Sequence, residues 1–407
     1  MINDIAMIAA AVAIAVVVLR PAMLKSQSWR ATVTPLASII GSGFLVAGPV
    51  IGHAAGHWAW AAMAGLCALS YLFGAAIRSN IRRAEPLLAD NPPNWLRGVD
   101  RAGDAALVIA YFVSVAYYLY LLAAFALKAG GIVDPNMART VTTVILIGLA
   151  VLGWLGGLHW LENVELVSVG LKLCAIGGII AALVAANSSA AIDGSFALLP
   201  VASTTTSGFE SVRILLGLVI LVQGFETSRY LGGSYDADMR VRTMRHAQLI
   251  AFAIYIAFIA LLTPYIDGRL PPTGGETHII DLIRPVGTFV APFVIAAALM
   301  SQLSAAVADM NGASGLIGSA SRQRVSVKLA YVVSATASIA VVWAGDIFSI
   351  IAWASKAFVL FYGIEAGTAL ALEWQQGKAR RWGLIALYAF GVVMAVLVIA
   401  LGTSAEA

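Results

Sequence analysis

The chain has 407 residues, of which 60% are hydrophobic and only 11% charged, and its mean hydropathy is +0.89. Soluble domains carry roughly a quarter charged residues, so this composition excludes a soluble globular protein and indicates a polytopic membrane protein. The net charge of +4 does not indicate nucleic-acid binding, because the basic residues fall in short connections between apolar segments.

The predicted fold is all-α and integral to the membrane, with about twelve transmembrane helices in one domain, 1–407. The apolar segments are 5–19, 33–52, 58–78, 104–128, 140–157, 162–186, 212–231, 245–266, 286–309, 327–343, 347–371 and 381–401. The first is short for a span. The two cysteines, Cys67 and Cys174, lie inside apolar segments, which favours packing roles over a disulfide.

The basic residues predict how the chain is oriented. Of its 25 lysines and arginines, 18 fall in alternate connections and five in the others, while Lys172 and Lys356 lie inside spans. Cytoplasmic loops carry an excess of such residues. We therefore expect a multi-pass protein of the inner (plasma) membrane with both termini outside the cytoplasm.

Two apolar segments carry glycines in mid-span. Gly41-Ser42-Gly43 lies within ASIIGSGFLVAGP (37–49), and Gly224 lies within LVQGFETSRYLGG (221–233) beside Gln223 and Glu226. The two segments are five spans apart, and paired interruptions of this kind are typical of inverted-repeat transporters with discontinuous helices. Close helix packing is the alternative role for the first triplet. Glu226 either meets an amine or caps freed N–H groups.

Three segments of the chain resemble core helices of the amino acid/polyamine/organocation (APC) superfamily of transporters. ASIIGSGFLVAGP is similar to its first core helix, VQGFETSRY to its sixth and ENVELVSVGLKLCAIGG (162–178) to its fifth. The resemblance implies a five-plus-five inverted repeat, the fold also seen in leucine-type sodium symporters, with discontinuous first and sixth core helices. The halves would be 31–190 and 208–375. A peripheral helix and cytoplasmic loop (1–30) would precede them, and a final helix (376–407) would follow.

The resemblance also implies where a solute binds, between the two broken helices and beneath an aromatic ring of the third core helix. An interface belt is the commoner place for a membrane tyrosine. The expected solute-binding residues are Ile40, Gly41, Ser42, Gly43, Gln223, Gly224, Phe225, Glu226 and Tyr117.

Ion coupling is expected near Lys172. APC members that work without sodium carry a lysine in the fifth core helix, whereas ALMSQLSAA (298–306) resembles the eighth core helix of sodium/solute symporters, with Gln302 in place of a second hydroxyl. The sequence thus favours a proton-coupled or exchange mechanism over sodium coupling. The expected ion-coupling residues are Lys172, Ser38, Ala298, Ser301 and Gln302, and the alternative sodium site is Ser38, Gly41, Ala298 and Ser301.

The function expected from the sequence is secondary active transport of a small organic solute by alternating access. An amino acid or amine is favoured, because broken helix ends suit a carboxylate and an ammonium group together. A sodium/solute symporter for a nucleobase or sugar, or a solute sensor on the same scaffold, are the alternatives. No HExxH or GxSxG motif is present, so no enzyme and no cofactor is expected. The lipid bilayer and the solute are the expected partners.

Overall fold

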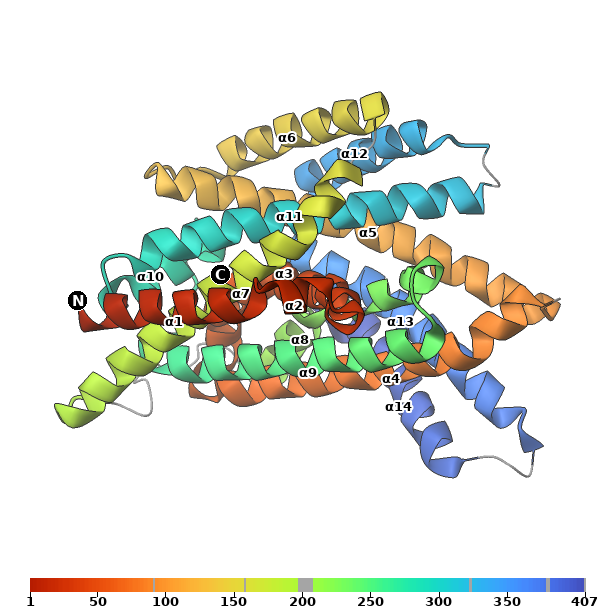
Figure 1. Cartoon of the computed structure of the whole chain (residues 1–407), viewed down its shortest axis with the longest axis horizontal. Coiled ribbons are helices and arrows are strands. Elements are labelled where there is room, and N and C mark those ends of the chain that lie inside the picture. The colour runs from red at the N-terminus through yellow and green to blue at the C-terminus, as the bar shows by residue number, and fades with distance from the viewer. Residues whose placement is uncertain (91, 157–158, 197–207, 322–323, 378–380, 406–407) are drawn as a thin grey trace.

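The computed structural model is a bundle of long helices (Figure 1). It describes residues 1–90, 92–156, 159–196, 208–321, 324–377 and 381–405, and for residues 42, 156 and 159–168 it describes the backbone only. The helices are α1 (Ile2–Val18), α2 (Pro21–Lys25), α3 (Gln27–Ala55), α4 (Ala59–Ala89), α5 (Asn94–Ala129), α6 (Pro135–Gly156), α7 (His159–Ile192), α8 (Gly208–Leu216), α9 (Ala237–Leu262), α10 (Ile279–Ile283), α11 (Val290–Ala320), α12 (Val327–Ala344), α13 (Ile347–Trp374) and α14 (Trp382–Leu401). The described part of the chain contains no strand.

The helices agree with the predicted apolar segments. Among the described residues, nine helical stretches are long and apolar enough to cross a membrane, and the longest, Gln27–Ala89, joins α3 and α4 through a 3-10 turn. The first predicted segment falls on α1, which is shorter than these nine. The seventh predicted segment, 212–231, falls on α8 and on the irregular stretch that follows it. The all-α membrane fold is therefore confirmed, while the number of crossings stays a prediction.

The predicted break at Gly41-Ser42-Gly43 is wrong. Helix α3 runs without interruption from Gln27 to Ala55 and passes through all three residues. Its glycines serve close packing instead, since a Cβ atom added to Gly43 would lie 2.9 Å from the Cα atom of Leu221. An unbroken helix keeps its backbone hydrogen bonds internal, which an apolar interior strongly favours.

The second predicted break is present. After α8, the chain forms a 3-10 turn, η2 (Val219–Val222), then an extended Gln223 and a left-handed Gly224 (φ 115°), before a second 3-10 segment, η3 (Phe225–Gly233). Glycine is needed at 224 for this backbone conformation. It is needed for space as well, because an added Cβ atom would lie 2.6 Å from the backbone nitrogen of Ile39 in α3.

The packing of the helices has a paired pattern. Helix α5 packs on α11, α6 on α12 and α4 on α9, and the contact of α7 with α11 has its counterpart in the contact of α13 with α5. If α3–α7 and α8–α13 are inverted repeats, their symmetry maps each of the first three contacts onto itself. It maps the contact of α7 with α11 onto the contact of α13 with α5. The pattern agrees with that repeat, which stays a prediction, as do the boundaries of the two halves.

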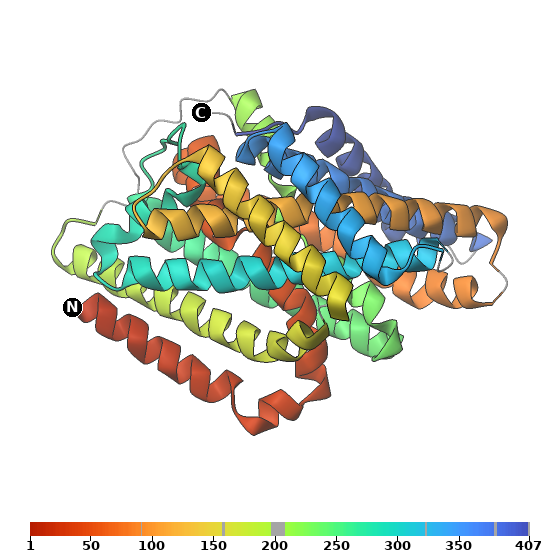
Figure 2. The same cartoon turned by 90° about the horizontal axis from the view of Figure 1, so that it is seen from above.

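Helix α1 lies on the outside of the bundle along α7 (Figure 2). The side chain of Asn3 donates a 2.7 Å hydrogen bond to the carbonyl of Val286, and Asp4 accepts one of 3.0 Å from the N–H of Phe289. These bonds attach the start of α1 to the segment that leads into α11. Both chain ends lie toward the same end of the bundle (Figure 1).

Candidate functional site

The break after Val222 places a carboxylate in the middle of the bundle. One oxygen of Glu226 accepts a 2.9 Å hydrogen bond from the N–H of Gly224 and a 2.7 Å bond from the hydroxyl of Tyr362 in α13. The amide of Gln223 donates a 2.5 Å bond to the hydroxyl of Tyr118 in α5. The broken segment is thus connected to α5 on one side and to α13 on the other.

Several polar atoms around this break are buried without a hydrogen-bond partner. They include the second carboxyl oxygen of Glu226, the amide oxygen of Gln223, and the hydroxyl groups of Tyr117, Ser38 and Ser228. Each such group costs about 1–3 kcal/mol relative to its exposure to water. A concentration of them at one place is typical of a functional site rather than of a core that only packs.

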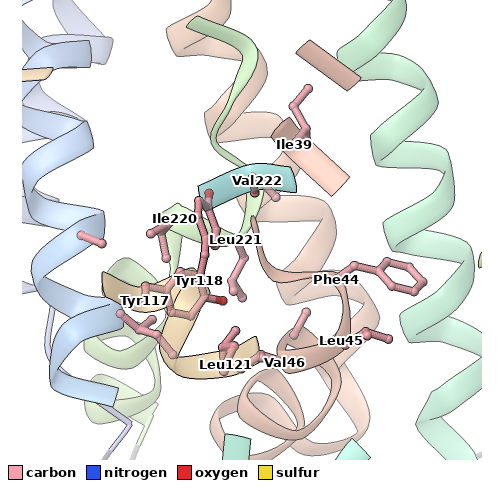
Figure 3. Packing of buried hydrophobic residues seen from close by; sticks show 14 of the residues in the cluster. Ile39, Phe44, Leu45, Val46, Tyr117, Tyr118, Leu121, Ile220, Leu221 and Val222 are labelled. Atoms are coloured by element: carbon pink, nitrogen blue, oxygen red, sulfur yellow. The ribbon is translucent and has the colours of Figure 1, made fainter. Parts of the chain in front are cut away.

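Six of the nine predicted solute-binding residues lie around the break: Gly43, Gln223, Gly224, Phe225, Glu226 and Tyr117. Figure 3 shows Tyr117 and Tyr118 beside Leu221, with the stretch from Phe44 to Val46 of α3 on the other side. Phe225 stacks on the ring of Tyr362, with centroids 4.8 Å apart. All of these side chains are buried.

Three of the predicted solute-binding residues lie elsewhere or outside the description. Ile40 and Gly41 belong to a neighbouring contact of α3 with α7 and α11, where Ile40 lines a small cavity. The side chain of Ser42 is outside the described residues. With α3 unbroken, no backbone amides are freed beside Gly43, so the predicted anion site there is not formed in this conformation.

Three of the five predicted ion-coupling residues, Lys172, Ser301 and Gln302, form a second cluster between α3, α7 and α11. Lys172 is 2% exposed, and its ammonium group donates a 3.4 Å hydrogen bond to the carbonyl of Ser301. A Cβ atom on Gly41 would lie 3.8 Å from that ammonium and 3.7 Å from the Ser301 hydroxyl. Gln302 lines the same cavity, which has room for about one water molecule.

Ser38 and Ala298 take other positions. The hydroxyl of Ser38 faces Gly224 and has no hydrogen-bond partner, so Ser38 belongs to the break rather than to the lysine cluster. Ala298 is buried one turn before Ser301 in α11. The expected contact of Lys172 with α3 and α11 is thus present in the geometry, while its role in coupling stays a prediction.

Comparison with known proteins places this geometry in a family. A family model described as an APC superfamily transporter matches residues 21–402. The chain belongs to the APC superfamily of transporters. A relative from Aquifex aeolicus, described as an uncharacterized protein, is 38% identical over 353 residues, which are 85% of this chain and 84% of the relative.

The fold of this APC transporter is shared by solved structures of a manganese transporter from Eremococcus coleocola. A point mutant of that protein superposes with a TM-score of 0.59 at 12% identity, covering 92% of this chain and 87% of the other. The same protein in complex with an aromatic bis-isothiourea substituted compound also gives 0.59, at 93% and 87% coverage. At this identity the likeness concerns the fold alone.

From its place in the span, the sequence predicts that Asp309 of α11 pairs with Arg30 or Arg322 as an inner latch. Arg322 lies outside the described residues, and this APC transporter buries Asp309 next to the break with Ser114 as its partner. Ser114 of α5 donates a hydrogen bond to its carboxylate, and the residue is 2% exposed. The signal in the sequence was a lone acid inside an apolar span. The spacing of residues in the sequence could not identify its partner, because Ser114 and Asp309 are 195 residues apart in the chain.

A partly buried ion network lies at the end of the bundle that the basic residues assign to the cytoplasm. Arg229 of η3 binds both Asp100 of α5 and Glu365 of α13, and the amide of Asn80 in α4 donates a 2.7 Å hydrogen bond to Glu365. The network connects the broken segment to three helices. The sequence left an outer gate, a helix contact and substrate binding open for Glu365, and the structure shows it in a contact between helices.

Proposed function

We propose that this protein is a secondary active transporter that moves a small organic solute, an amino acid or an amine, by alternating access. The observation that carries the proposal is the broken segment at Gly224, buried at the centre of an APC fold and surrounded by unpartnered polar atoms of Gln223, Glu226 and Tyr117. Discontinuous helices at mid-membrane are where transporters of this architecture bind their solutes.

The membrane and the orientation are part of the same proposal. The basic residues favour the inner (plasma) membrane with both termini outside the cytoplasm. In that orientation the network of Arg229, Asp100 and Glu365 closes the cytoplasmic side of the site. The conformation is then one in which the solute path to the cytoplasm is shut.

Coupling to protons or solute exchange, rather than to sodium, is supported by Lys172. Its ammonium lies beside two of the four residues of the sodium-coupled alternative, Gly41 and Ser301. A fixed positive charge at this place disfavours a second cation there. A lysine that loads and releases a proton would instead couple the cycle to a pH gradient.

Uptake into proteoliposomes, with sodium and pH gradients imposed separately, tests both the transport and its coupling. We expect accumulation with an inward proton gradient or by exchange, without sodium, and its loss in Lys172→Met. Accumulation driven by sodium, abolished by Ser301→Ala and unchanged by Lys172→Met, would establish the sodium-symporter alternative. Binding of a solute with no uptake under any gradient would establish the sensor.

Manganese, which the titles of the structural neighbours name, is not proposed as the cargo. Among the described residues, no group of three or more His, Cys, Asp or Glu side chains is arranged to hold a metal ion. Divalent manganese is usually held by several hard oxygen or imidazole ligands. An organic solute fits the aromatic and hydroxyl lining of the break better.

A further inference from the structure

One face of α5 carries three hydroxyl-bearing residues toward the break. Tyr111, Ser114 and Tyr118 are spaced i, i+3 and i+7, so they project from the same side of the helix. All three are buried. Ser114 holds Asp309 of α11 and Tyr118 holds Gln223 of the broken segment, so these two polar groups lie about one helical turn apart along α5.

Two buried carboxyl groups lie near this face. Glu226 is 0% exposed and Asp309 is 2% exposed, and the charge of Glu226 is near enough to act on Asp309. Glu226 has one oxygen without a hydrogen-bond partner, and the amide oxygen of Gln223 beside it is also buried and unpartnered. The acidic pair therefore has unused acceptor capacity from both a carboxylate and a neutral amide.

Neither carboxyl group of this pair has a basic partner among the described residues. Two other buried acids of the same chain are paired, since Glu365 binds Arg229 and Glu373 binds Arg83. Burying a carboxylate without a counter-ion is costly. In a site that binds a cation, the solute itself supplies the missing counter-ion. Glu226 and Asp309 thus differ from Glu365 and Glu373, whose arginine partners indicate structural roles.

Aromatic rings surround the pair. Tyr362, whose hydroxyl binds Glu226, is stacked by Phe225, and Phe358 lies 5.9 Å from Tyr111 and 6.2 Å from Tyr362 between ring centroids. Aromatic faces attract organic ammonium groups, and more strongly where water is excluded. Carboxylates, a carbonyl oxygen and aromatic faces together are the groups that recognise a protonated amine.

For a carboxylate on the solute, the same region offers neutral hydroxyl groups, such as those of Tyr117, Ser38 and Ser228, and few charged or backbone donors. The N–H of Gly224 is already bound by Glu226, and α3 releases no amides at Gly43. Lys172 points to the carbonyl of Ser301. That residue is eight positions before Asp309 in α11, or about 12 Å along the helix axis.

We propose that Asp309 and Glu226 form a binding site for the ammonium group of an organic amine, and that this site selects amines over the amino acids of the same carbon skeleton. The inference rests on the proposed transport function and narrows its solute class. Ser114 and Tyr362 position the two carboxylates, and Gln223 supplies a neutral acceptor. An amino acid would bring its own carboxylate into an already negative site, which is unfavourable.

The test is a thermal-shift titration of the purified full-length protein with matched pairs of ligands, each an amino acid and the amine that its decarboxylation gives, such as ornithine and 1,4-diaminobutane. Ligand that binds the folded state raises the melting temperature by mass action. We expect at least one amine to act at a concentration about tenfold or more below that of its amino acid, the range of one charge-assisted hydrogen bond.

Asp309→Asn should weaken binding of that amine at least about tenfold, while Asp90→Asn, the same change at an exposed position after α4, should leave it unchanged. Ser114→Ala removes the hydroxyl that donates to Asp309 and to the carbonyl of Tyr111 but leaves the carboxylate in place. It should weaken amine binding less, and it is the variant to use if Asp309→Asn does not fold. Amino acids that bind as well as their amines, no response to any amine, or unchanged amine binding in both site variants would each overturn the inference.

Uptake of the same ligands into proteoliposomes separates this inference from the proposed function. Uptake of an amino acid or another organic solute, without amine binding, would leave transport standing and refute the amine site. Amine binding that depends on Asp309, without uptake under any gradient, would leave the site standing and refute transport.

Discussion

The two carboxyl oxygens of Glu226 have different surroundings. One oxygen satisfies the N–H that the left-handed Gly224 leaves without a helical partner and accepts the hydroxyl of Tyr362. The other oxygen is buried and unpartnered. The sequence left capping and contact with an amine open for this residue, and the geometry shows the capping bond, while contact of the second oxygen with an amine stays a prediction.

Two substitutions at Glu226 separate these roles. Glu226→Gln keeps an oxygen that accepts from Gly224 and Tyr362, so we expect near-normal thermal stability and strongly reduced solute uptake. Glu226→Ala leaves the Gly224 N–H buried without a partner and should also destabilise the fold, by about 1–3 kcal/mol. Thermal denaturation and proteoliposome uptake measure the two effects. Normal uptake by folded Glu226→Gln protein would mean that the carboxylate is structural only.

The predictability of this structure differs between its helices and its break. Apolar length and the positions of charge predict where helices begin and end, because a segment in lipid must satisfy its backbone hydrogen bonds internally. Whether a glycine triplet opens a helix or lets a neighbour approach depends on what packs against it. Gly41 and Gly43 face Ala305 and Leu221, which belong to distant segments, and the sequence gives no direct signal of those contacts.

The same reasoning applies to the candidate site. Gln223, Gly224 and Glu226 could be found from sequence because a break needs glycine and a buried acid is costly in an apolar span. The bond from Ser114 to Asp309 could not, because it depends on how α5 and α11 are rotated against each other. Local chemistry was therefore predictable, and the pairing across helices was not.

The packing role of the α3 glycines gives a prediction about stability. Gly43→Ala places a Cβ atom within 2.9 Å of the Cα atom of Leu221, so α3 and the broken segment must separate. We expect a loss of about 1–3 kcal/mol, as for overpacked cores, seen as a lower melting temperature. Gly65→Ala in α4, where no atom lies within 4 Å of the added Cβ, is the matched control and should be neutral or stabilising. Equal stability of both variants would contradict the close contact at Gly43.

The molecule as a whole is closed more firmly at one end than at the other. At the end assigned to the cytoplasm, Arg229 joins η3 to α5 and α13 with its side chain only 10% exposed. At the opposite end, Lys128 of α5 binds Asp281 of α10 across 2.8 Å, with the aspartate side chain 37% exposed. Exposed pairs are worth little, whereas a buried pair that loses one partner leaves an uncompensated charge.

Loss of the Arg229 network should therefore open the cytoplasmic end. Arg229→Gln leaves Glu365 and Asp100 without their shared cation, and we expect faster amide hydrogen exchange in η3 and in the adjoining ends of α5 and α13. Glu365→Gln should act in the same direction, and the double variant should be less than additive because both changes remove one interaction. Arg82→Gln is the matched control, since its partner Asp238 has a side chain 85% exposed and the pair is exposed on both sides. Additive effects, or exchange as slow as in the Arg82 variant, would show that the network does not hold the two halves of the bundle together. Faster exchange confined to η3, α5 and α13 would identify Arg229 as the residue through which the solute site is closed toward the cytoplasm.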